Sequence, residues 1–574
     1  MKRQKQESIL AAFSRQQKPL VKRAKGATVR ADVSGTRSRD LHVIGALDAA
    51  QSDDDDDDAD ADGSVTDADM MSSQEDAPAC ARRTDRVASA VVPALHDEAL
   101  SLYPVVTSEQ FLHTTKDVKD SVHGIITFEP ICWRIIDTLQ FQRLRNLHQL
   151  GAASLVYIGA THTRFEHCLG VAHLAEQMVS SIRAHQPYLP ISSVDVLCIK
   201  IAGLCHDLGH GPFSHVFDGI YVKQLRRRGV VDETFDWTHE QGSLVMFDHL
   251  LRANEIDVGQ YGLEEVDLVF IKELIYGGPL PGSNALRGRT RPDQQFLYGF
   301  VNNAKSGLDV DKLDYFMRDA RQTGAKASCD VEILIRNARV LVDRDDPNGA
   351  LSICYPEKLV GQIMQAFRTR FELHQTVYQH KHVRAAEYML CDVLLAANDH
   401  ILIKNCRISD IVHHVEAYQH LDDRILARIE ESESDDLGEA RAIRQRMLTR
   451  QCYDYVGSTT RTAYSQQLTE DRLLNEILAS SPDRSLVQHH ENVIVEFVQM
   501  HFGKGADDPI QYVRFFAKNS HSSSVCYQLP ADSYGMYRPL SFQDSSIRVF
   551  VKQKQLVRRI HHESDIATRT NTAA

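Results

Sequence analysis

The sequence has few aromatic residues and no long apolar run. Its 574 residues include only two Trp, and aromatic residues make up 7% of the chain. No stretch approaches the roughly 18 consecutive apolar residues that a membrane-spanning helix needs, and no secretory signal pattern opens the chain. We therefore expect no association with a membrane. Hydrophobic residues still make up 43% of the chain, which is enough for a sizeable core.

The cysteines also lack a recognisable framework. There are eleven of them, an odd number, and no two form a C-x-x-C pair. A disulfide scaffold needs paired cysteines and a structural zinc ribbon needs C-x-x-C pairs, so the pattern argues against both. It favours reduced thiols in an intracellular compartment.

Charged residues are distributed unevenly along the chain. Lys and Arg number 65 against 78 Asp and Glu, a net charge of −13. Residues 1–50 carry eleven basic and four acidic side chains, whereas residues 51–100 carry three and fifteen, including the aspartate run Asp53–Asp58. Such a segment cannot bury enough apolar surface to offset the entropy lost on ordering. We therefore expect residues 1–100 to form a disordered tail, basic and then acidic.

Apolar spacing predicts a mainly α fold after this tail. Over residues 101–400 helical spacing predicts helices at Arg164–Ile182, Asp195–Asp207, Leu308–Ala320 and Phe367–Ala397. Residues 401–574 have a mixed character and predict a smaller α/β C-terminal lobe. This lobe has charged helical sequence over Asp422–Leu448 and strand-like runs at Val493–Val498, Tyr512–Phe516 and Ile547–Val551.

Four separated side chains form a candidate metal site. His206-Asp207 ends an apolar helix and leads into a Gly/Pro turn, His167 lies upstream and Asp311 lies downstream. Two imidazoles with two carboxylates suit Mn, Fe, Zn or Ni, and they leave positions for water or a phosphate oxygen. Any one of these residues alone is more often an ordinary core or surface residue. The four together indicate metal-assisted hydrolysis.

The chain resembles a known family over about His113 to Val551. The matching segments are Ile135–Arg145, His148–Gly151, Thr163–His167, Leu204–His215, Trp237–Gly242 and Asp309–Phe316. These segments are similar to the SAM-and-HD-domain dNTP triphosphohydrolases. The resemblance implies a helical HD core over residues 101–400. It also implies hydrolysis of dNTPs to deoxynucleoside plus tripolyphosphate, which controls dNTP pools. Residues 1–100 are too polar for the SAM domain, so we expect that domain to be missing.

The same resemblance suggests which residues perform catalysis. His215 is the best candidate for proton transfer, because imidazole titrates near neutral pH. His210, Asp218 and His239 are expected to orient or assist it. The sequence leaves open which of the four moves the proton.

Substrate contacts are expected from one helix face and its surroundings. Asp311, Tyr315 and Asp319 are spaced four residues apart, so they share a face of the predicted helix. Lys312, Arg164 and Arg370 can neutralise a triphosphate. By resemblance, Gln149 and Asp319 hold the 3′-hydroxyl, Leu150 and Tyr315 lie against the sugar, and Tyr378 and Gln379 lie near the sugar and base. Tyr315 and Tyr378 fit ordinary helix packing equally well.

Two further functions remain open at this stage. One is a different HD phosphohydrolase, such as a monophosphatase or an alarmone hydrolase. The other is nucleic-acid binding or nuclease activity. The second has little support, because the charge outside the tail is negative and no basic stripe interleaved with aromatics is present.

The resemblance also implies control by nucleotides. Asp137, Gln142 and Arg145 lie on one short predicted helix and resemble a guanine-specific activator site, to which Lys116 and Arg450 belong as well. A neighbouring dNTP activator site is matched at Val156, Arg339, Lys358, His380 and Lys381. Lys119 stands where Asn is expected there, and Pro356 where Arg is expected. We expect GTP and dNTPs, with Mg²⁺ on their phosphates, to assemble a homotetramer, although solvated helix charges explain any single residue.

The basic N-terminus has the composition of a localisation signal. Two basic clusters, at Lys2–Lys5 and Lys18–Lys25, predict a bipartite nuclear localisation signal, with the cytoplasm or a mitochondrial presequence as alternatives. Between them, Gln6–Phe13 resembles a sliding-clamp binding box, with Ala12 in place of its first aromatic residue.

Overall fold

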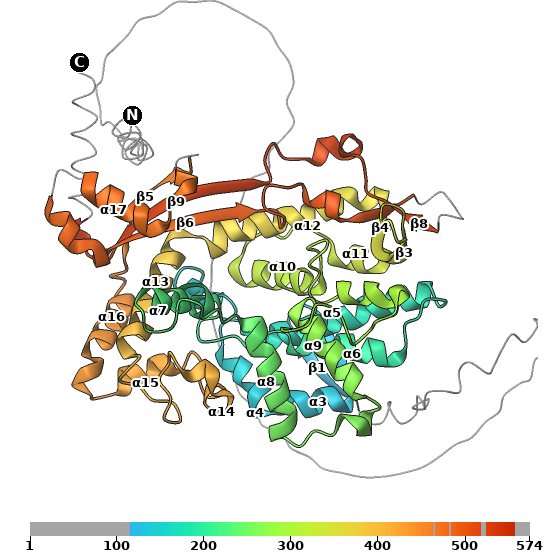
Figure 1. The fold of residues 1–574 in the computed structure, drawn as a ribbon, viewed down its shortest axis with the longest axis horizontal. Helices are drawn as coiled ribbons and strands as arrows, with labels where there is room; N and C mark the ends of the chain where they lie inside the picture. Colours follow the sequence, from blue (N-terminus) through green and yellow to red (C-terminus); the bar gives the residue numbers. More distant parts are fainter. Residues whose placement is uncertain (1–114, 463–464, 481–483, 518–523, 557–574) are drawn as a thin grey trace, which may run out of the picture. The chain divides into compact units, whose positions relative to one another are not determined.

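The computed structural model describes residues 115–462, 465–480, 484–517 and 524–556 (Figure 1). All of these residues belong to one unit of the chain. The predicted tail, the localisation signal and the sliding-clamp box lie outside the described residues, as does His113.

Helices dominate the first part of the described chain. A hairpin of β1 (Lys116–Asp120) and β2 (Gly124–Phe128) precedes them. The helices of this part are α3 (Pro130–Ile136), α4 (Leu139–Gln142), α5 (Arg164–His185), α6 (Ser193–Cys205), α7 (Val222–Arg227), α8 (His239–Ala253), α9 (Glu265–Tyr276), α10 (Val310–Thr323), α11 (Val331–Asn337), α12 (Val360–Leu373) and α13 (Lys381–Ala397). Later helices are α14 (Val415–Tyr418), α15 (Ile425–Glu431), α16 (Gly438–Leu448) and α17 (Glu470–Ser480).

Two sheets belong to the second half of the chain. The four-stranded sheet has the order β7-β4-β3-β8, with β3 (Arg339–Asp343), β4 (Leu351–Pro356), β7 (Arg514–Phe516) and β8 (Val525–Cys526). The three-stranded antiparallel sheet has the order β5-β9-β6, with β5 (Asp454–Thr460), β6 (Val493–His501) and β9 (Gln543–Val551). The mainly α fold with a mixed C-terminal lobe is therefore confirmed.

Helices α5 and α6 have well-defined starts. The Thr163 backbone N–H donates to the Glu166 carboxylate at 3.0 Å, and the Ser192 N–H donates to the Asp195 carboxylate at 2.8 Å. These contacts satisfy amide groups that would otherwise lack partners at a helix start. The two helices then pack closely against each other through small and apolar side chains. This pairing fixes the ends of α5 and α6 from which candidate metal ligands emerge.

Three elements differ from the sequence-based predictions. Phe367–Ala397 is not one helix, because a π-helical turn at His374–Tyr378 separates α12 from α13. The single short helix expected to carry Asp137, Gln142 and Arg145 is also wrong. Thr138 adopts an extended conformation there and caps α4, so α3 ends at Ile136 and a 3₁₀ turn follows α4. The strand predicted from Tyr512 begins at Arg514, after a 3₁₀ turn that starts with Pro509.

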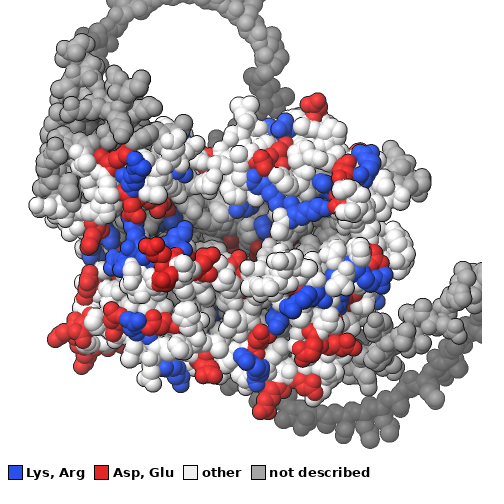
Figure 2. Space-filling view, viewed as in Figure 1, with Lys and Arg blue, Asp and Glu red and all other residues white. Residues whose placement is uncertain are grey.

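One buried core includes residues from both sides of residue 400. It extends from Ile126 in β2 to Phe550 in β9, and a smaller cluster packs α17 against the three-stranded sheet. Within the described residues, no helix is both long and apolar enough to cross a membrane. On the face drawn in Figure 2, acidic and basic side chains are interspersed.

Candidate active site

The four predicted metal ligands come together from three helices. His167 lies on α5, His206 and Asp207 directly follow α6, and Asp311 lies in the first turn of α10. The Nε2 atoms of His167 and His206 lie 3.1 and 3.6 Å from Asp311 Oδ1. The Asp207 carboxylate lies 3.5 Å from His206 Nε2 and 3.7 Å from His167 Nε2. One small region therefore holds all four donors.

The hydrogen bonds of the two imidazoles show that these residues fit a cation. His167 Nδ1 lies 2.7 Å from Asp314 Oδ2, and His206 Nδ1 lies 2.8 Å from the Gly203 carbonyl oxygen. Both partners are acceptors, so each Nδ1 carries a hydrogen and each Nε2 is the nitrogen that can offer a lone pair to a cation. His206 Nε2 is buried and has no hydrogen-bond partner among the described residues. Two such lone pairs beside two carboxylates suit a divalent metal.

Asp314 is a site residue that the sequence analysis missed. It is fully buried and lies 2.6 Å from His123 Nε2, and it also accepts from Arg318 Nε at 2.9 Å. Burial alone would raise the pKa of Asp314, but Arg318 and the two histidines hold it well below its usual range. Asp314 is therefore a buried anion that fixes the His167 ring. Its position three residues after Asp311 was the available signal.

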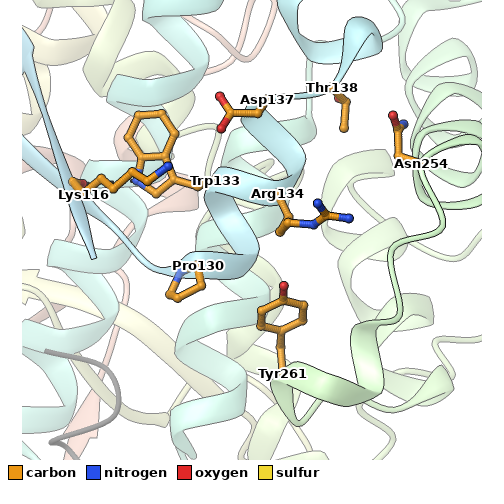
Figure 3. A pocket seen from close by; sticks show the side chains of 8 residues that line it. All are labelled: Lys116, Pro130, Trp133, Arg134, Asp137, Thr138, Asn254 and Tyr261. Carbon is orange, nitrogen blue, oxygen red and sulfur yellow. Dashed lines mark hydrogen bonds between the residues drawn. The ribbon is translucent and has the colours of Figure 1, made fainter. Parts of the chain in front are cut away.

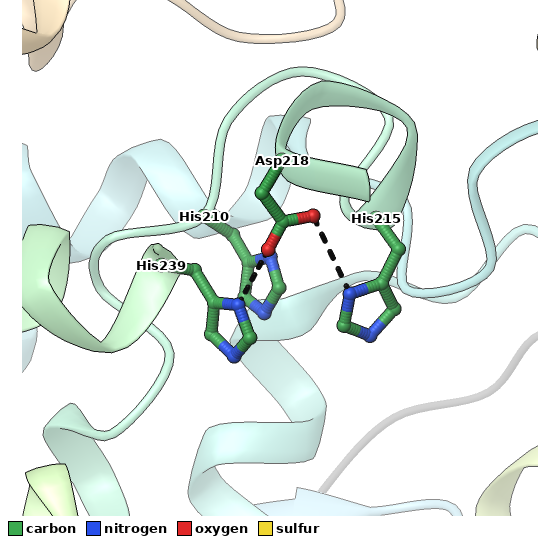
Figure 4. A group of neighbouring side chains, drawn as sticks. All are labelled: His210, His215, Asp218 and His239. Atoms are coloured by element: carbon green, nitrogen blue, oxygen red, sulfur yellow. Dashed lines mark hydrogen bonds and ion pairs between the residues drawn. The ribbon is translucent and has the colours of Figure 1, made fainter. Parts of the chain in front are cut away.

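The four predicted catalytic residues form a second cluster beside the first (Figure 4). His239 Nδ1 lies 2.6 Å from Asp218 Oδ2, and His215 Nδ1 lies 3.6 Å from Asp218 Oδ1. The rings of His210 and His239 stack with centroids 3.8 Å apart. The His215 side chain is exposed, whereas His210 is buried. His215 is therefore the member of the cluster that solvent or a ligand can reach most easily.

Burial and neighbouring charges shift the pKa values of three residues in this second cluster. Burial, followed by Arg164 and His239, lowers the pKa of His210 well below its usual value. Burial would also lower the pKa of His239, but the hydrogen bond with Asp218 and the negative charges of Asp218, Glu240 and Asp207 together raise it. Asp218 stays anionic, because His215 and His239 lower its pKa against the effect of burial. A neutral His210 thus stacks on a His239 that Asp218 helps to keep protonated.

The loop that joins the two clusters follows a strained path. A Cβ atom on Gly209 would lie 2.1 Å from Ser243 N and 2.2 Å from the His239 carbonyl oxygen, so only glycine allows this loop to approach α8. Phe213 and Ser214 have φ angles of 59° and 57°. Each such residue costs of order 1–3 kcal/mol and persists only when its surroundings hold it.

The predicted nucleoside contacts gather around Asp319. Its Oδ2 accepts from the Tyr378 hydroxyl at 2.6 Å, and its Oδ1 lies 2.8 Å from Nε2 of the buried His162. The rings of Tyr315 and Tyr378 lie 6.5 Å apart. Gln149 is buried, and its Oε1 finds no partner in the part of the chain that the structure describes. Leu150, half-buried, follows Gln149 directly.

The cations expected to meet a triphosphate each have a protein partner. Lys312 Nζ donates to Asp309 Oδ2 at 2.8 Å, and Arg370 donates to the His501 carbonyl at 2.5 Å. Arg164 donates to Ser214 Oγ at 2.8 Å and pairs with Asp207. The carbonyl of Gln379 accepts from Arg548.

The predicted guanine-site residues are only partly adjacent. Lys116 and Asp137 line a cavity of about 360 Å³ that Trp133 and Tyr261 also line (Figure 3). Gln142 Oε1 accepts from Arg145 Nε at 2.8 Å, and the Arg145 guanidinium lies 3.5 Å from the centre of the Phe165 ring. Arg450 is exposed two residues after α16.

The second predicted activator set is more scattered within one chain. His380 and Lys381 line a cavity of about 370 Å³, together with residues of β5, β6 and β9. Tyr157, next to Val156, packs its ring 5.9 Å from that of His380. Arg339 lies on β3 and the exposed Lys358 shortly after β4. Of the two departures, Lys119 is exposed on β1 and Pro356 is buried on β4.

The helical fold and the two His/Asp clusters place the chain in the class of HD-domain hydrolases. Comparisons with known proteins agree with this assignment. The HD domain family matches residues 164–260. Deoxynucleoside triphosphate triphosphohydrolase SAMHD1 of Bos taurus is 38% identical over 77% of this chain and 75% of its own. The Homo sapiens SAMHD1 is 40% identical over 77% and 71%, and the Dictyostelium discoideum homolog is 32% identical over 77% and 78%. The chain belongs to the SAMHD1 family. It is therefore an enzyme, a hydrolase.

Proposed function

We propose that this chain is a metal-dependent triphosphohydrolase that converts a dNTP and water to a deoxynucleoside and tripolyphosphate, and thereby controls dNTP pools. The observation that carries the proposal is the convergence of two imidazole lone pairs and two carboxylates beside the cluster around Asp218. The names of the relatives support the substrate class.

The residues divide the reaction between them. A Zn, Fe or Mn ion held by His167, His206, Asp207 and Asp311 would supply Lewis-acid chemistry at the α-phosphate. Water attacks the α-phosphorus and loses one proton to solvent, the bond from that phosphorus to the 5′-oxygen breaks, and the leaving oxygen takes a proton. His215 is exposed on the cluster and gives this proton, while Asp218 orients its ring.

The residues around Asp319 support a preference for deoxyribose. Tyr315 lies on the same face of α10 as Asp311, and we expect its ring to leave little room for a 2′-hydroxyl. Gln149 Oε1 is a buried acceptor that a 3′-hydroxyl can satisfy, and Asp319 is the second acceptor nearby. Tyr378 and Gln379 lie near the sugar and base.

Product analysis tests this proposal. Purified protein is incubated with Mg²⁺, GTP and dGTP labelled at the α- or the γ-phosphate, and the products are separated by ion-exchange chromatography. Both labels are expected in tripolyphosphate, and a variant with His206→Arg and Asp207→Asn is expected to lose both metal and activity. Release of labelled orthophosphate would instead identify a phosphatase, and no turnover would refute hydrolysis of dNTPs.

The proposal includes activation by GTP and a dNTP and assembly of a homotetramer. Lys116 and Asp137 share a cavity, which supports a polar ligand there, and Asp137 can accept from N1 and N2 of guanine. His380 and Lys381 line the second cavity. Lys119 adds a positive charge where Asn is expected, but Pro356 supplies no guanidinium, so the preference among dNTPs is expected to be altered.

The N-terminus supports two further proposals. Its basic clusters suit a nuclear address, and fluorescence imaging with and without residues 1–26 tests this, since an unchanged distribution would contradict it. A sliding-clamp contact through Gln6–Phe13 is tested by pull-down with and without Phe13→Ala.

A further inference from the structure

A segment outside the matched HD region covers the loop between the two active-site clusters. Residues 418–423, here called the clamp segment, begin with the last residue of α14 and continue into the chain that follows it in the C-terminal lobe. The Tyr418 hydroxyl donates to the Gly209 carbonyl at 2.6 Å. Arg143 links the two regions, because it donates to the carbonyls of Leu421 and His210 at 2.8 and 2.6 Å. The loop between the two clusters, here called the catalytic loop, is therefore held by a segment that lies some 200 residues further along the chain.

Asp423 is the clamp residue that contacts both Phe213 of the loop and His148. Its Oδ1 accepts from the Phe213 backbone N–H at 2.6 Å, and its Oδ2 accepts from the His148 backbone N–H at 2.9 Å. His148 Nδ1 also lies 2.7 Å from Oδ2. The Asp423 side chain is 8% exposed, so water competes little for these contacts. One carboxylate thus holds the peptide of a residue with positive φ, two positions before His215.

The contacts continue from Asp423 to the metal ligands. The Ser214 hydroxyl donates to the His148 carbonyl at 2.6 Å and accepts from Arg164 Nε at 2.8 Å. Arg164 in turn pairs with Asp207. An unbroken series of hydrogen bonds therefore joins Asp423 to the first cluster, and the peptide it holds leads directly into the second.

We propose that Asp423 is a positioning residue that holds the Phe213–His215 turn in its catalytic conformation. A carboxylate is needed because all three groups that face it are donors, and an amide offers only one acceptor oxygen. Without it, Phe213 and Ser214 can relax from the left-handed region, and His215 moves away from the reacting bond. The inference rests on the proposed function, and it adds a residue from the C-terminal lobe to the active site.

Asp423→Asn tests the proposal, with Asp422→Asn as a matched control. Asp422 is the neighbouring buried aspartate, but its side chain bonds to Arg424, two residues further along the chain. Each variant is assayed for dGTP turnover, for metal bound per chain, and for the number and Kd of sites that bind a dGTP analogue in which a methylene group replaces the scissile 5′-oxygen. We expect Asp423→Asn to lower kcat by about 10- to 100-fold, with metal content, site number and Kd unchanged. We expect Asp422→Asn to remain within about twofold of wild type.

Three results would overturn the proposal. They are unchanged turnover in Asp423→Asn, equal losses in both variants, and a loss of turnover matched by lost sites or lost metal. Should Asp423→Asn fail to fold, Ser214→Ala decides, because it cuts the same series of bonds and leaves Asp423 in place. It is expected to lower kcat alone, and an unchanged kcat would contradict the proposal. Wild-type protein without dNTP turnover would refute the proposed function rather than this role.

Discussion

At the scale of single residues, the site depends on side chains that fix the orientation of others. His167 can present its Nε2 lone pair because Asp314 accepts from its Nδ1 at 2.7 Å. Asp314 is in turn surrounded by His123 and Arg318, and Arg318 also donates to Asp120 at 2.9 Å. The His167 ring is therefore fixed by contacts that do not involve the clamp segment.

Asp314→Asn is expected to weaken metal retention by about 10- to 100-fold, because an amide cannot accept from His123, His167 and Arg318 together. Metal bound per chain is measured by mass spectrometry after dialysis against graded chelator. Asp195→Asn is the control. Asp195 is buried in the first turn of α6, at the opposite end of that helix from His206, and it pairs with Arg289. Equal metal retention in the two variants would contradict the role of Asp314.

The pair of His148 and Asp423 predicts a pH dependence of stability. The hydrogen bond with Asp423 raises the pKa of His148 above 6.5. A raised folded-state pKa stabilises the protein fully below the unfolded value, and this effect is lost as pH rises through the folded value. His148 and Asp423 line a cavity that other charged residues also line, namely Arg145, Arg424, Glu430 and Arg444. The effect is therefore measured as a difference between wild type and Asp423→Asn.

The Tm of wild type minus that of Asp423→Asn should therefore be larger near about pH 6 than near about pH 9. Differential scanning calorimetry at several pH values measures it. A difference that grows with pH would show that the charge of His148 does not stabilise the pair.

The motif residues could be predicted from sequence because their types and spacing carry the chemistry. His206 and Asp207 are adjacent, and Asp311, Tyr315 and Asp319 share a helical face. His162 and Asp423 could not be found in this way. His162 contacts Asp319, and Asp423 contacts Phe213 and His148. All of these partners are more than 150 positions away, and no local pattern records such contacts.

At the scale of elements, long amphipathic helices were predictable and interruptions were not. The predicted helices over Arg164–Ile182 and Leu308–Ala320 are confirmed as α5 and α10. The π-helical turn at His374–Tyr378 changes the spacing of apolar residues little, so the sequence pattern does not reveal it. This turn nevertheless places the Tyr378 hydroxyl within hydrogen-bond distance of Asp319. The break at Thr138 likewise depends on one capping hydroxyl, which accepts from Phe141 N.

Gly209→Ala tests how closely the catalytic loop must approach α8. The added Cβ would overlap backbone atoms of Ser243 and His239, so we expect a destabilisation of about 2–5 kcal/mol and loss of turnover. Gly219→Ala is the control, because no described atom lies within 4 Å of its Cβ position. Urea unfolding and dGTP turnover are measured for both. A Gly209→Ala protein as stable and active as the control would show that the loop does not need this approach.

At the scale of the whole molecule, the C-terminal lobe contacts the loop between the two clusters. Sequence predicted that lobe and its strands Val493–Val498 and Ile547–Val551, which form parts of β6 and β9. It did not predict that residues 418–423 cover the HD loop, because packing between distant segments follows from the whole core and not from local periodicity.

Assembly is the matching prediction at this scale. Light scattering is expected to give a tetramer with GTP plus a dNTP and smaller species without them, because an activator can shift assembly only by preferring one state. Asp137→Ala should lose the response to GTP, while Asp117→Ala, on β1, should keep it. An unchanged size distribution in wild type would contradict nucleotide-driven assembly.

The central claim is that the two clusters direct water to the α-phosphorus of a dNTP. The most direct measurement is hydrolysis of dGTP in ¹⁸O-labelled water, with mass spectrometry of every product. Attack at the α-phosphorus, with departure of the 5′-oxygen, predicts one ¹⁸O atom in tripolyphosphate and none in deoxyguanosine. Label in deoxyguanosine, or in orthophosphate or pyrophosphate as the first product, would contradict the account.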